Sequence, residues 1–412
     1  MSLATTFQIM RMFATMVGRV PTGHLWYLLR RLRFEKPHRV DGQIRINTFF
    51  PPYPSRAFDR FCRALIDRRR VPYSTYLAAT SACPFRCPHC SYTGRPAGQM
   101  SREQMLDIIG QIKSLGTCTL GLTGGEPLLR DDLEDIVAAA APEMVCIVFT
   151  AGYGLDAQRA RRLAAAGVSC VTIGLESADA ATHDRIRGQA GSFAMAQSAV
   201  EECLESGVYT AVSTVGMRER VAAGELESIY ELARRWGVGE FRVLAPVATG
   251  AWVRCGSQML TPQESRALRD FHISHNRRRE GPTVVCNAYL ESDELFGCGA
   301  GFHHLFIDAT GQVCPCDLTP LSFGDVTVEP LAEIWERMGT FFPLPRCGCL
   351  MGKVTRELSA AAAADVAAEF TRLPLPREKS EPLCPRRSVT DPLPEGYKRL
   401  LKGPSTLTCR ER

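Results

Sequence analysis

Three cysteines in one short run have the spacing of an iron–sulfur ligand set. Cys83, Cys87 and Cys90 lie in the run Cys-Pro-Phe-Arg-Cys-Pro-His-Cys, separated by three residues and then by two. Three such thiolates can bind three irons of a [4Fe–4S] cluster and leave the fourth iron open to a substrate or a cofactor. A structural zinc site uses four protein ligands, usually as two paired thiols. The odd number of thiols therefore favours the cluster over zinc, and over three unrelated cysteines in a loop.

A second motif ends an apolar run. Residues 117–122 lead into Thr123-Gly124-Gly125-Glu126-Pro127. Two glycines after a buried strand allow a ligand to approach the backbone closely. The carboxylate of Glu126 could accept charge-assisted hydrogen bonds from an amino group. Taken alone, the motif is also typical of a turn before the helix that is expected from Asp131.

Together the two motifs resemble those of the radical SAM superfamily. In that family a CxxxCxxC loop binds the catalytic [4Fe–4S] cluster, and a Gly-Gly-Glu-Pro strand end positions S-adenosylmethionine. The matching residues here are Cys83, Cys87 and Cys90 for the cluster, and Gly124, Gly125, Glu126 and Pro127 for the cofactor. The resemblance implies that a donor such as flavodoxin or ferredoxin reduces the cluster. Cleavage of S-adenosylmethionine would then yield a 5′-deoxyadenosyl radical that abstracts hydrogen from the substrate.

The elements that must position these residues alternate between strands and helices. We expect strands over 74–79, 117–122, 145–150, 169–175, 209–215 and 240–245, and helices over 102–115, 131–140, 157–166, 193–206 and 226–236. This order indicates a parallel sheet covered by helices, with the site at the carboxyl ends of the strands. Six units are fewer than the eight of a full barrel. The resemblance implies an α/β fold with a partial (β/α)6 barrel, and the count agrees.

Two further strand ends carry candidate cofactor residues by the same resemblance. Relatives commonly have Thr-Asn-Gly after the third strand, where this chain has Thr150-Ala151-Gly152, so only Thr150 carries over. After the fourth strand, Gly174 stands where many relatives have a serine, and Glu176 or Ser177 could reach the ribose or the amino acid. An ordinary strand cap explains both residues equally well. Arg187 could neutralise a carboxylate, or could form a surface salt bridge.

A second group of cysteines follows the expected barrel. Cys298 precedes a glycine turn at Gly311, which would bring Cys316 back toward it. The order of cysteines, together with Phe-Gly-Asp-Val at 323–326, resembles the SPASM or twitch domain that holds auxiliary [4Fe–4S] clusters. One residue separates Cys347 from Cys349 where relatives usually have two, so we expect one auxiliary cluster. The expected ligands are Cys298, Cys316, Cys347 and Cys349, with Cys314 or Cys384 as substitutes. Structural zinc on the same thiols is the rival.

The composition limits the class of protein. The chain has 412 residues, 45% of them hydrophobic, so it can bury a full core and carry more than one domain. Its 17 cysteines are too irregular for a secreted disulfide scaffold. We expect a reducing, cytoplasmic location, because the sequence shows no secretory signal and no apolar run that is long enough for a bilayer. Buried, inert thiols are expected at Cys62, Cys118, Cys146, Cys170 and Cys203.

The basic charge is concentrated near the N-terminus. Up to Thr75 the chain carries fourteen Lys and Arg against four Asp and Glu, so this part has a charge of +10 and the remainder −5. A basic, aromatic helix pair around Pro21-Thr22-Gly23 could lie on a membrane surface. We favour a simpler interpretation, in which the pair covers the open side of the next domain. No nucleic-acid partner is expected.

These patterns divide the chain into four expected regions. They are a basic extension over 1–72, the barrel over 73–282, the auxiliary-cluster domain over 283–385 and a tail over 386–412. Relatives with such a C-terminal domain often modify peptides or protein side chains, so we expect a peptide or protein maturase. The alternatives are radical modification of a small anionic or lipid-like substrate at a membrane, and a non-catalytic iron–sulfur or zinc protein that binds a partner.

Overall fold

A long parallel sheet forms the centre of the molecule. The computed structural model describes residues 3–252, 259–360, 374–388 and 390–401. Its strands are β3 (Ser74–Thr80), β4 (Thr119–Gly124), β5 (Val145–Thr150), β6 (Cys170–Gly174), β7 (Thr210–Val215), β8 (Glu240–Leu244), β9 (Thr283–Cys286), β10 (His304–Ile307) and β11 (Val313–Cys314). They pair in the order β11-β10-β3-β4-β5-β6-β7-β8-β9. Within the described residues β9 and β11 do not pair, so the sheet is an incomplete barrel, as expected.

The parallel part of the sheet is longer than the six expected units. β10 pairs in parallel with β3, and β9 pairs in parallel with β8, while only β11 is antiparallel to its neighbour. Both additional strands come from the region that we assigned to the auxiliary domain. Each is only four residues long. The local sequence pattern of such a short apolar run does not indicate which distant strand it pairs with.

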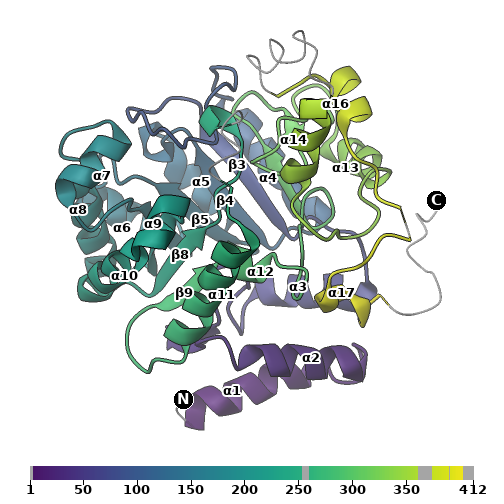
Figure 1. Cartoon of the computed structure of the whole chain (residues 1–412), viewed down its shortest axis with the longest axis horizontal. Helices are drawn as coiled ribbons and strands as arrows, with labels where there is room; N and C mark the ends of the chain where they lie inside the picture. The colour runs from purple at the N-terminus through teal and green to yellow at the C-terminus, as the bar shows by residue number, and fades with distance from the viewer. Residues whose placement is uncertain (1–2, 253–258, 361–373, 389, 402–412) are drawn as a thin grey trace.

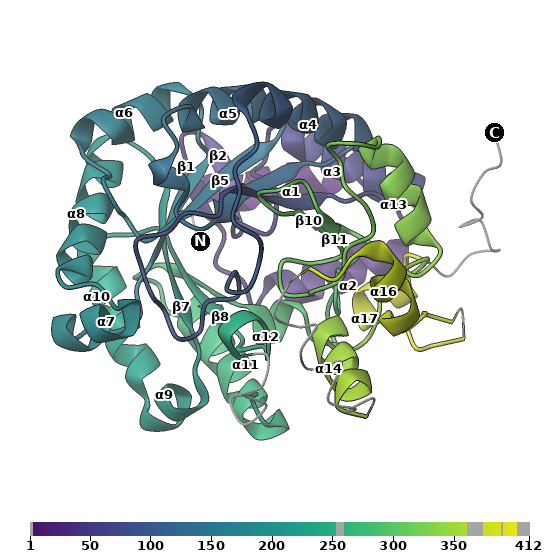
Figure 2. The ribbon, with the colours of Figure 1, turned by 90° about the horizontal axis from the view of Figure 1, so that it is seen from above.

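Helices cover the outside of the sheet (Figure 2). They are α4 (Arg102–Leu115), α5 (Leu133–Ala140), α6 (Ala157–Ala165), α7 (Ala180–Arg187), α8 (Ser192–Glu205), α9 (Arg218–Ala223), α10 (Glu225–Trp236) and α11 (Pro262–Asn276). The 3₁₀ turns η1 (Pro127–Leu129) and η2 (Gly250–Trp252) and the short helix α12 (Asn287–Leu290) follow β4, β8 and β9. Local signals fix several ends: a capping box of Ser101 and Gln104 starts α4, and Gly116 ends it in a left-handed conformation. The main core lies between these helices and the outward face of the strands.

The inward face of the strands is left for the site. Along β8, for example, Phe241 and Val243 belong to the main core, whereas Arg242 and Leu244 line the interior cavity. Small residues make room there. A Cβ atom on Gly121 would lie 2.5 Å from the ring of Tyr76. The pleat of the strands therefore separates a packed outer layer from an open interior.

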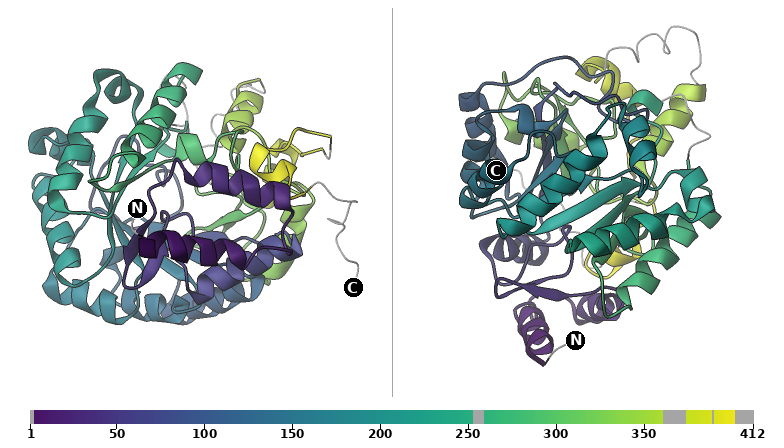
Figure 3. Two further views of the ribbon diagram at one scale, coloured as in Figure 1. Left: turned by 90° about the horizontal axis from the view of Figure 1, so that it is seen from below. Right: turned by 90° about the vertical axis from the view of Figure 1, so that its left-hand side faces the viewer.

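The N-terminal extension lies across the lower end of the barrel (Figure 1; Figure 3, left). It contains α1 (Leu3–Ala14), α2 (Thr22–Leu32), β1 (His38–Val40), β2 (Gln43–Arg45) and α3 (Arg56–Asp67). A second apolar cluster joins it to the C-terminal part through Met12, Met16, Leu25, Phe58 and Tyr397. Among the described residues, no helix combines the length and the apolar character that crossing a bilayer requires.

The C-terminal part packs beside β10 and β11. Its helices are α13 (Leu331–Gly339), α14 (Leu350–Ala360), α16 (Arg377–Leu383) and α17 (Glu395–Lys398). In the expected tail over 386–412, residue 389 and residues 402–412 lie outside the described part of the chain. The five thiols expected to be buried and inert are all buried and free: Cys62, Cys118, Cys146, Cys170 and Cys203.

Candidate active site

A cavity of about 810 Å³ runs through the interior of the barrel. Its walls include Tyr73 and Thr119 at the starts of strands, and Gly124 and Thr150 at strand ends. The cavity therefore extends from the base of the barrel to the mouth. Three of its lining residues are Cys83, Cys87 and Cys90, in the loop that follows β3.

Backbone hydrogen bonds hold the cysteine loop at the mouth. The amide of Arg86 donates to the carbonyl of Arg187 at 2.8 Å, and the amide of Cys90 donates to the carbonyl of Cys87 at 3.2 Å. Burial raises the pKa of the Cys83 thiol to about 11, and it also raises the pKa of Cys87. Metal binding at these thiols must therefore release protons.

The glycine pair joins the end of β4 to this loop. The amide of Gly125 donates to the carbonyl of Thr80 at 2.7 Å, and the amide of Glu126 donates to the carbonyl of Ala82 at 2.8 Å. A Cβ atom on Gly125 would lie 2.0 Å from the Ala82 carbonyl oxygen, and one on Gly124 would lie 2.4 Å from that of Thr80. The glycines are therefore needed so that the backbone of the cysteine loop can approach β4.

Glu126 is held in a fixed orientation beneath the loop. Its carboxylate accepts hydrogen bonds from the Thr150 hydroxyl at 2.6 Å, the Ala151 amide at 2.8 Å and the Leu128 amide at 3.1 Å. Burial raises its pKa, and these hydrogen bonds oppose the rise. The structure thus brings two expected residues, Glu126 and Thr150, together. Ala151 replaces the asparagine of relatives, yet its backbone amide still contributes.

A buried ion cluster ties β6 to the cysteine loop. Glu176 lies 3.1 Å from Arg187, 3.3 Å from His89 and 3.7 Å from Arg220. Burial by itself would raise the pKa of Glu176, but contact with His89 and with the guanidinium groups of Arg187 and Arg220 holds it well below its usual range. Arg187 also lies 3.7 Å from the Cys87 sulfur. Arg187 is therefore part of a buried network and not of a surface salt bridge.

The same cluster explains why Gly174 departs from the family pattern. A Cβ atom on Gly174 would lie 1.9 Å from Nη2 of Arg187, so the guanidinium occupies the space of the absent side chain. Sequence reasoning missed His89 and Arg220. His89 could have been found because it lies within the cysteine run, whereas nothing in the sequence singles out Arg220 on α9.

Two other expected cofactor residues lie outside the cavity walls. Pro127 begins the 3₁₀ turn η1, directly after Glu126. The hydroxyl of Ser177 accepts a hydrogen bond from the amide of Asp179 at 3.1 Å, as in an ordinary turn. The roles of Pro127 and Ser177 in cofactor binding stay predictions without support from the geometry.

The second cysteine group reaches the same cavity from the other side. Cys298, Cys316 and Cys349 belong to its walls. Burial raises the pKa of the Cys298 thiol to about 12, with the neighbouring Cys349 adding to the rise. Cys347 is placed differently: its sulfur lies 3.4 Å from the carbonyl oxygen of Pro392, away from the cavity. Three of the four expected auxiliary ligands are thus brought together.

The remaining candidates near this group are a histidine and a carboxylate. The ligand atoms of His304, Cys316 and Asp317 lie within 4.8 Å of one another. His303, by contrast, is buried and within 2.7 Å of the Tyr397 hydroxyl. The two substitute thiols point elsewhere: Arg95 lies 3.6 Å from the Cys314 sulfur, and Cys384 is buried in the main core.

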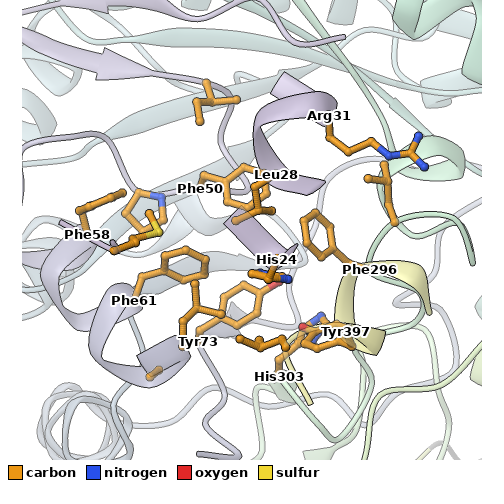
Figure 4. A pocket seen from close by; sticks show the side chains of 18 of the residues that line it. His24, Leu28, Arg31, Phe50, Phe58, Phe61, Tyr73, Phe296, His303 and Tyr397 are labelled. Carbon is orange, nitrogen blue, oxygen red and sulfur yellow. The ribbon is translucent and has the colours of Figure 1, made fainter. Parts of the chain in front are cut away.

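A second, apolar cavity of about 140 Å³ lies between the N-terminal helices and the base of the barrel. Figure 4 shows His24, Phe61 and Tyr397 around it, from three separate segments. Five residues line both cavities: Phe50, Tyr73, Leu290, Phe296 and His303. The two cavities therefore share one wall.

Comparison with known proteins agrees with this arrangement. The Radical SAM superfamily model matches residues 77–233, and the model of the SPASM iron–sulfur cluster-binding domain matches residues 298–342. The mycofactocin maturase MftC of Mycobacterium ulcerans (strain Agy99) is 32% identical over 327 residues, which cover 74% of this chain and 85% of that protein. The chain belongs to the radical SAM superfamily. It is therefore an enzyme that uses a [4Fe–4S] cluster and S-adenosylmethionine, and it carries an auxiliary iron–sulfur domain.

Two further proteins show the range of this radical SAM enzyme's relatives. An AdoMet-dependent heme synthase of Methanosarcina barkeri (strain Fusaro / DSM 804) is 26% identical over 300 residues, covering 66% of this chain and 85% of that protein. The crystal structure of Streptococcus suis SuiB, bound to the precursor peptide SuiA, shares the fold with a TM-score of 0.55 and 14% identity. That likeness covers 67% of this chain and 68% of SuiB.

The family assignment decides two of the alternatives. The expected cofactors are confirmed, so the non-catalytic interpretation is wrong, and the SPASM match favours iron–sulfur over zinc at the second cysteine group. The donor set fits these cofactors, because three thiols face one cavity beside the buried Glu126 carboxylate. Both matched segments lie inside the regions expected for the barrel and the auxiliary domain. The exact bounds of those regions stay predictions.

Proposed function

We propose that this enzyme abstracts hydrogen from a peptide or protein substrate bound inside the barrel. The observation that carries the proposal is the shared cavity: both cysteine groups line one space of about 810 Å³. A peptide side chain fits a space of that size, and a cleft open at the mouth leaves room for the rest of a chain. A relative of 32% identity is named a maturase, and SuiB of the same fold was crystallised with a precursor peptide.

Each residue of the site has a separate task in this proposal. Cys83, Cys87 and Cys90 would hold the catalytic cluster, whose electron cleaves S-adenosylmethionine and supplies the hydrogen-abstracting 5′-deoxyadenosyl radical. Glu126 would accept the amino group of the cofactor, because its carboxylate is already oriented by Thr150. Arg187 and Glu176 would fix the loop, and a substrate that fills the cavity would exclude water.

The second cysteine group would hold one auxiliary cluster through Cys298, Cys316 and Cys349. These three thiols face the cavity, so the auxiliary cluster would lie beside the substrate. We propose a donor such as flavodoxin or ferredoxin for the reducing electron. We also propose a reducing compartment such as the cytoplasm, because the cysteines in the described part of the chain form no disulfide.

A second candidate substrate is an anionic, lipid-like molecule presented at a membrane. Five of the seven exposed large apolar side chains among the described residues are on the N-terminal helices or the turn between them: Phe7, Met10, Val17, Trp26 and Leu29. The exposed residues Arg11, Arg19, Arg30 and Arg33 lie among them. Such a surface suits an anionic bilayer. The apolar cavity beneath it would suit a hydrocarbon chain.

Deuterium transfer distinguishes the two substrates. Cells that make this protein are grown in deuterated medium, and their peptides, lipids and small metabolites are separated. Each fraction is incubated anaerobically with the reconstituted enzyme and unlabelled S-adenosylmethionine, and 5′-deoxyadenosine is analysed by mass spectrometry. The proposal expects deuterium in 5′-deoxyadenosine from the peptide fraction. Transfer from the lipid fraction alone would overturn it in favour of the second candidate. A Cys83→Ala, Cys87→Ala, Cys90→Ala variant is the control and should form none.

A further inference from the structure

One buried arginine of the barrel interior has no assigned task. Arg242 lies on β8, is 2% exposed and lines the large cavity. It stands two residues before the end of its strand, so it lies roughly 7 Å below the mouth at the usual strand rise. The cysteine loop and Glu126 follow strand ends. Arg242 therefore faces the part of the cavity below the expected cofactor site.

The guanidinium of Arg242 is incompletely paired. Its Nε and Nη1 atoms are buried and make no hydrogen bond within the described part of the chain. The nearest carboxylate oxygen belongs to Glu240, at 3.9 Å from Nε, which is too long for a hydrogen bond. Glu240 itself accepts hydrogen bonds from the amide and the hydroxyl of Thr48. A buried guanidinium with unpaired donors costs free energy, and because Arg242 also lines the cavity, we take it to indicate a missing ligand.

The surroundings of Arg242 define the shape of that ligand. The rings of Phe49 and Phe149 each lie 5.1 Å from its central carbon, so the guanidinium lies over two aromatic faces. The Thr119 hydroxyl, another unpaired buried polar atom, lines the same cavity. The Tyr76 phenol is also close, since Arg242 opposes the rise that burial causes in its pKa.

Other buried arginines of the cavity are already used. Arg187 pairs with Glu176 at 3.1 Å, and Arg95 donates to the carbonyl oxygens of Asp317 and Thr319 at 3.2 and 3.0 Å. Both therefore brace loops of the protein itself. Arg242 lies against aromatic rings, and within the described part of the chain no carboxylate comes closer to it than Glu240 at 3.9 Å.

We propose that Arg242 anchors a carboxylate group of the substrate inside the barrel. A guanidinium donates charge-assisted hydrogen bonds to a carboxylate within its own plane, which suits a cation whose faces lie against aromatic rings. The apolar rings beside it favour a carboxylate that is attached to an apolar or aromatic body. This inference rests on the proposed function at one point, the kind of molecule that carries the carboxylate. If the substrate is a peptide, the carboxylate would be its C-terminus or an acidic side chain.

Binding of a small probe tests the anchor without turnover. Isothermal titration of the reconstituted full chain compares phenylacetate with its neutral isostere phenylacetamide. The wild type should bind phenylacetate about tenfold more tightly, as expected for a charge-assisted pair in a buried site. Arg242→Met should remove that preference, and Arg242→Lys should keep part of it. Arg161→Met, an exposed arginine on α6, is the matched control and should retain the full preference. Equal binding of both probes by the wild type would overturn the proposal.

A second variant covers the case in which Arg242→Met alone does not fold. Removing one member of a buried pair leaves an unpaired charge, so the double variant Glu240→Gln, Arg242→Met removes both. It should fold and bind the two probes equally. A double variant that still prefers phenylacetate would exclude Arg242 as the anchor. Inorganic phosphate is the third probe. If the wild type binds phosphate more tightly than phenylacetate, the ligand of Arg242 is a phosphate group, and the proposal of a carboxylate is overturned. None of these results depends on deuterium transfer, so the anchor and the peptide substrate can fail separately.

Discussion

At the scale of single residues, Glu126 combines burial with three hydrogen bonds that orient its carboxylate. Glu126→Gln keeps the size and the acceptor for Thr150, but it removes the charge that would attract the amino group of S-adenosylmethionine. We expect the affinity for S-adenosylmethionine to fall by about tenfold to a hundredfold, the range for hydrogen bonds to charged groups. Equilibrium dialysis of the reconstituted protein measures it. Glu201→Gln on α8 is the exposed control, and an unchanged affinity in Glu126→Gln would remove Glu126 from this role.

We expect Glu176 to contribute mainly to the stability of the folded protein. Its substitution by Gln would leave Arg187 and Arg220 without their buried anion, at a cost of about 3–5 kcal/mol. Because the folded protein lowers the pKa of Glu176, this stabilisation is complete above the usual pKa of glutamate, about 4.3, and is lost as the pH falls below it. Urea unfolding of the metal-free protein should show a large difference between the two proteins at pH 7. The difference should shrink below pH ~4, and equal stability at pH 7 would contradict the ion cluster.

At the scale of elements, the contact between β4 and the cysteine loop can be tested through a glycine. Gly125→Ala would place a methyl group 2.0 Å from the Ala82 carbonyl, so the loop must move. We expect loss of the iron bound by that loop, while the iron of the auxiliary domain remains. Gly110→Ala on α4 is the control, because nothing lies within 4 Å of its Cβ position. Full iron content in Gly125→Ala would show that the loop tolerates the shift.

The auxiliary thiols are distinguished by their positions. Replacing Cys298, Cys316 or Cys349 by Ala should lower iron and sulfide per chain, because all three line the cavity. Cys347→Ala should leave both unchanged, because its sulfur lies near Pro392. Chemical analysis of iron and sulfide after anaerobic reconstitution gives the answer. Equal losses in all four variants would restore Cys347 as a ligand.

The elements also show what local pattern can and cannot predict. The strand ends at Thr150 and near Gly174 were predictable, because alternating and apolar runs reflect the packed face of each strand. The pairing of β9 and β10 was not, since it depends on contacts with strands that are distant in the sequence. For the same reason Arg220 and Arg242 were missed: their partners, or their lack of partners, exist only in the folded barrel.

At the scale of the whole molecule, the N-terminal surface predicts binding to anionic membranes. Vesicles with about 30% phosphatidylserine should bind the full chain at low salt and release it at ~0.5 M salt, which co-sedimentation measures. Trp26→Ala with Leu29→Ala should weaken the binding, because both side chains are exposed on α2. Leu129→Ala, exposed on another face, is the control. Binding that is unaffected by the α2 variant would reject this surface.

The open sheet has a consequence for the size of substrate that the scaffold accepts. A closed barrel has a diameter fixed by its number of strands and their stagger. Here no ladder joins β9 to β11 within the described residues, and the connection from β9 to β10 spans the gap. That connection supplies Leu290, Phe296 and His303 to the walls of both cavities. One wall of the reaction chamber is therefore formed by side chains on a connecting segment, so substitutions there can reshape it while every strand keeps its neighbours.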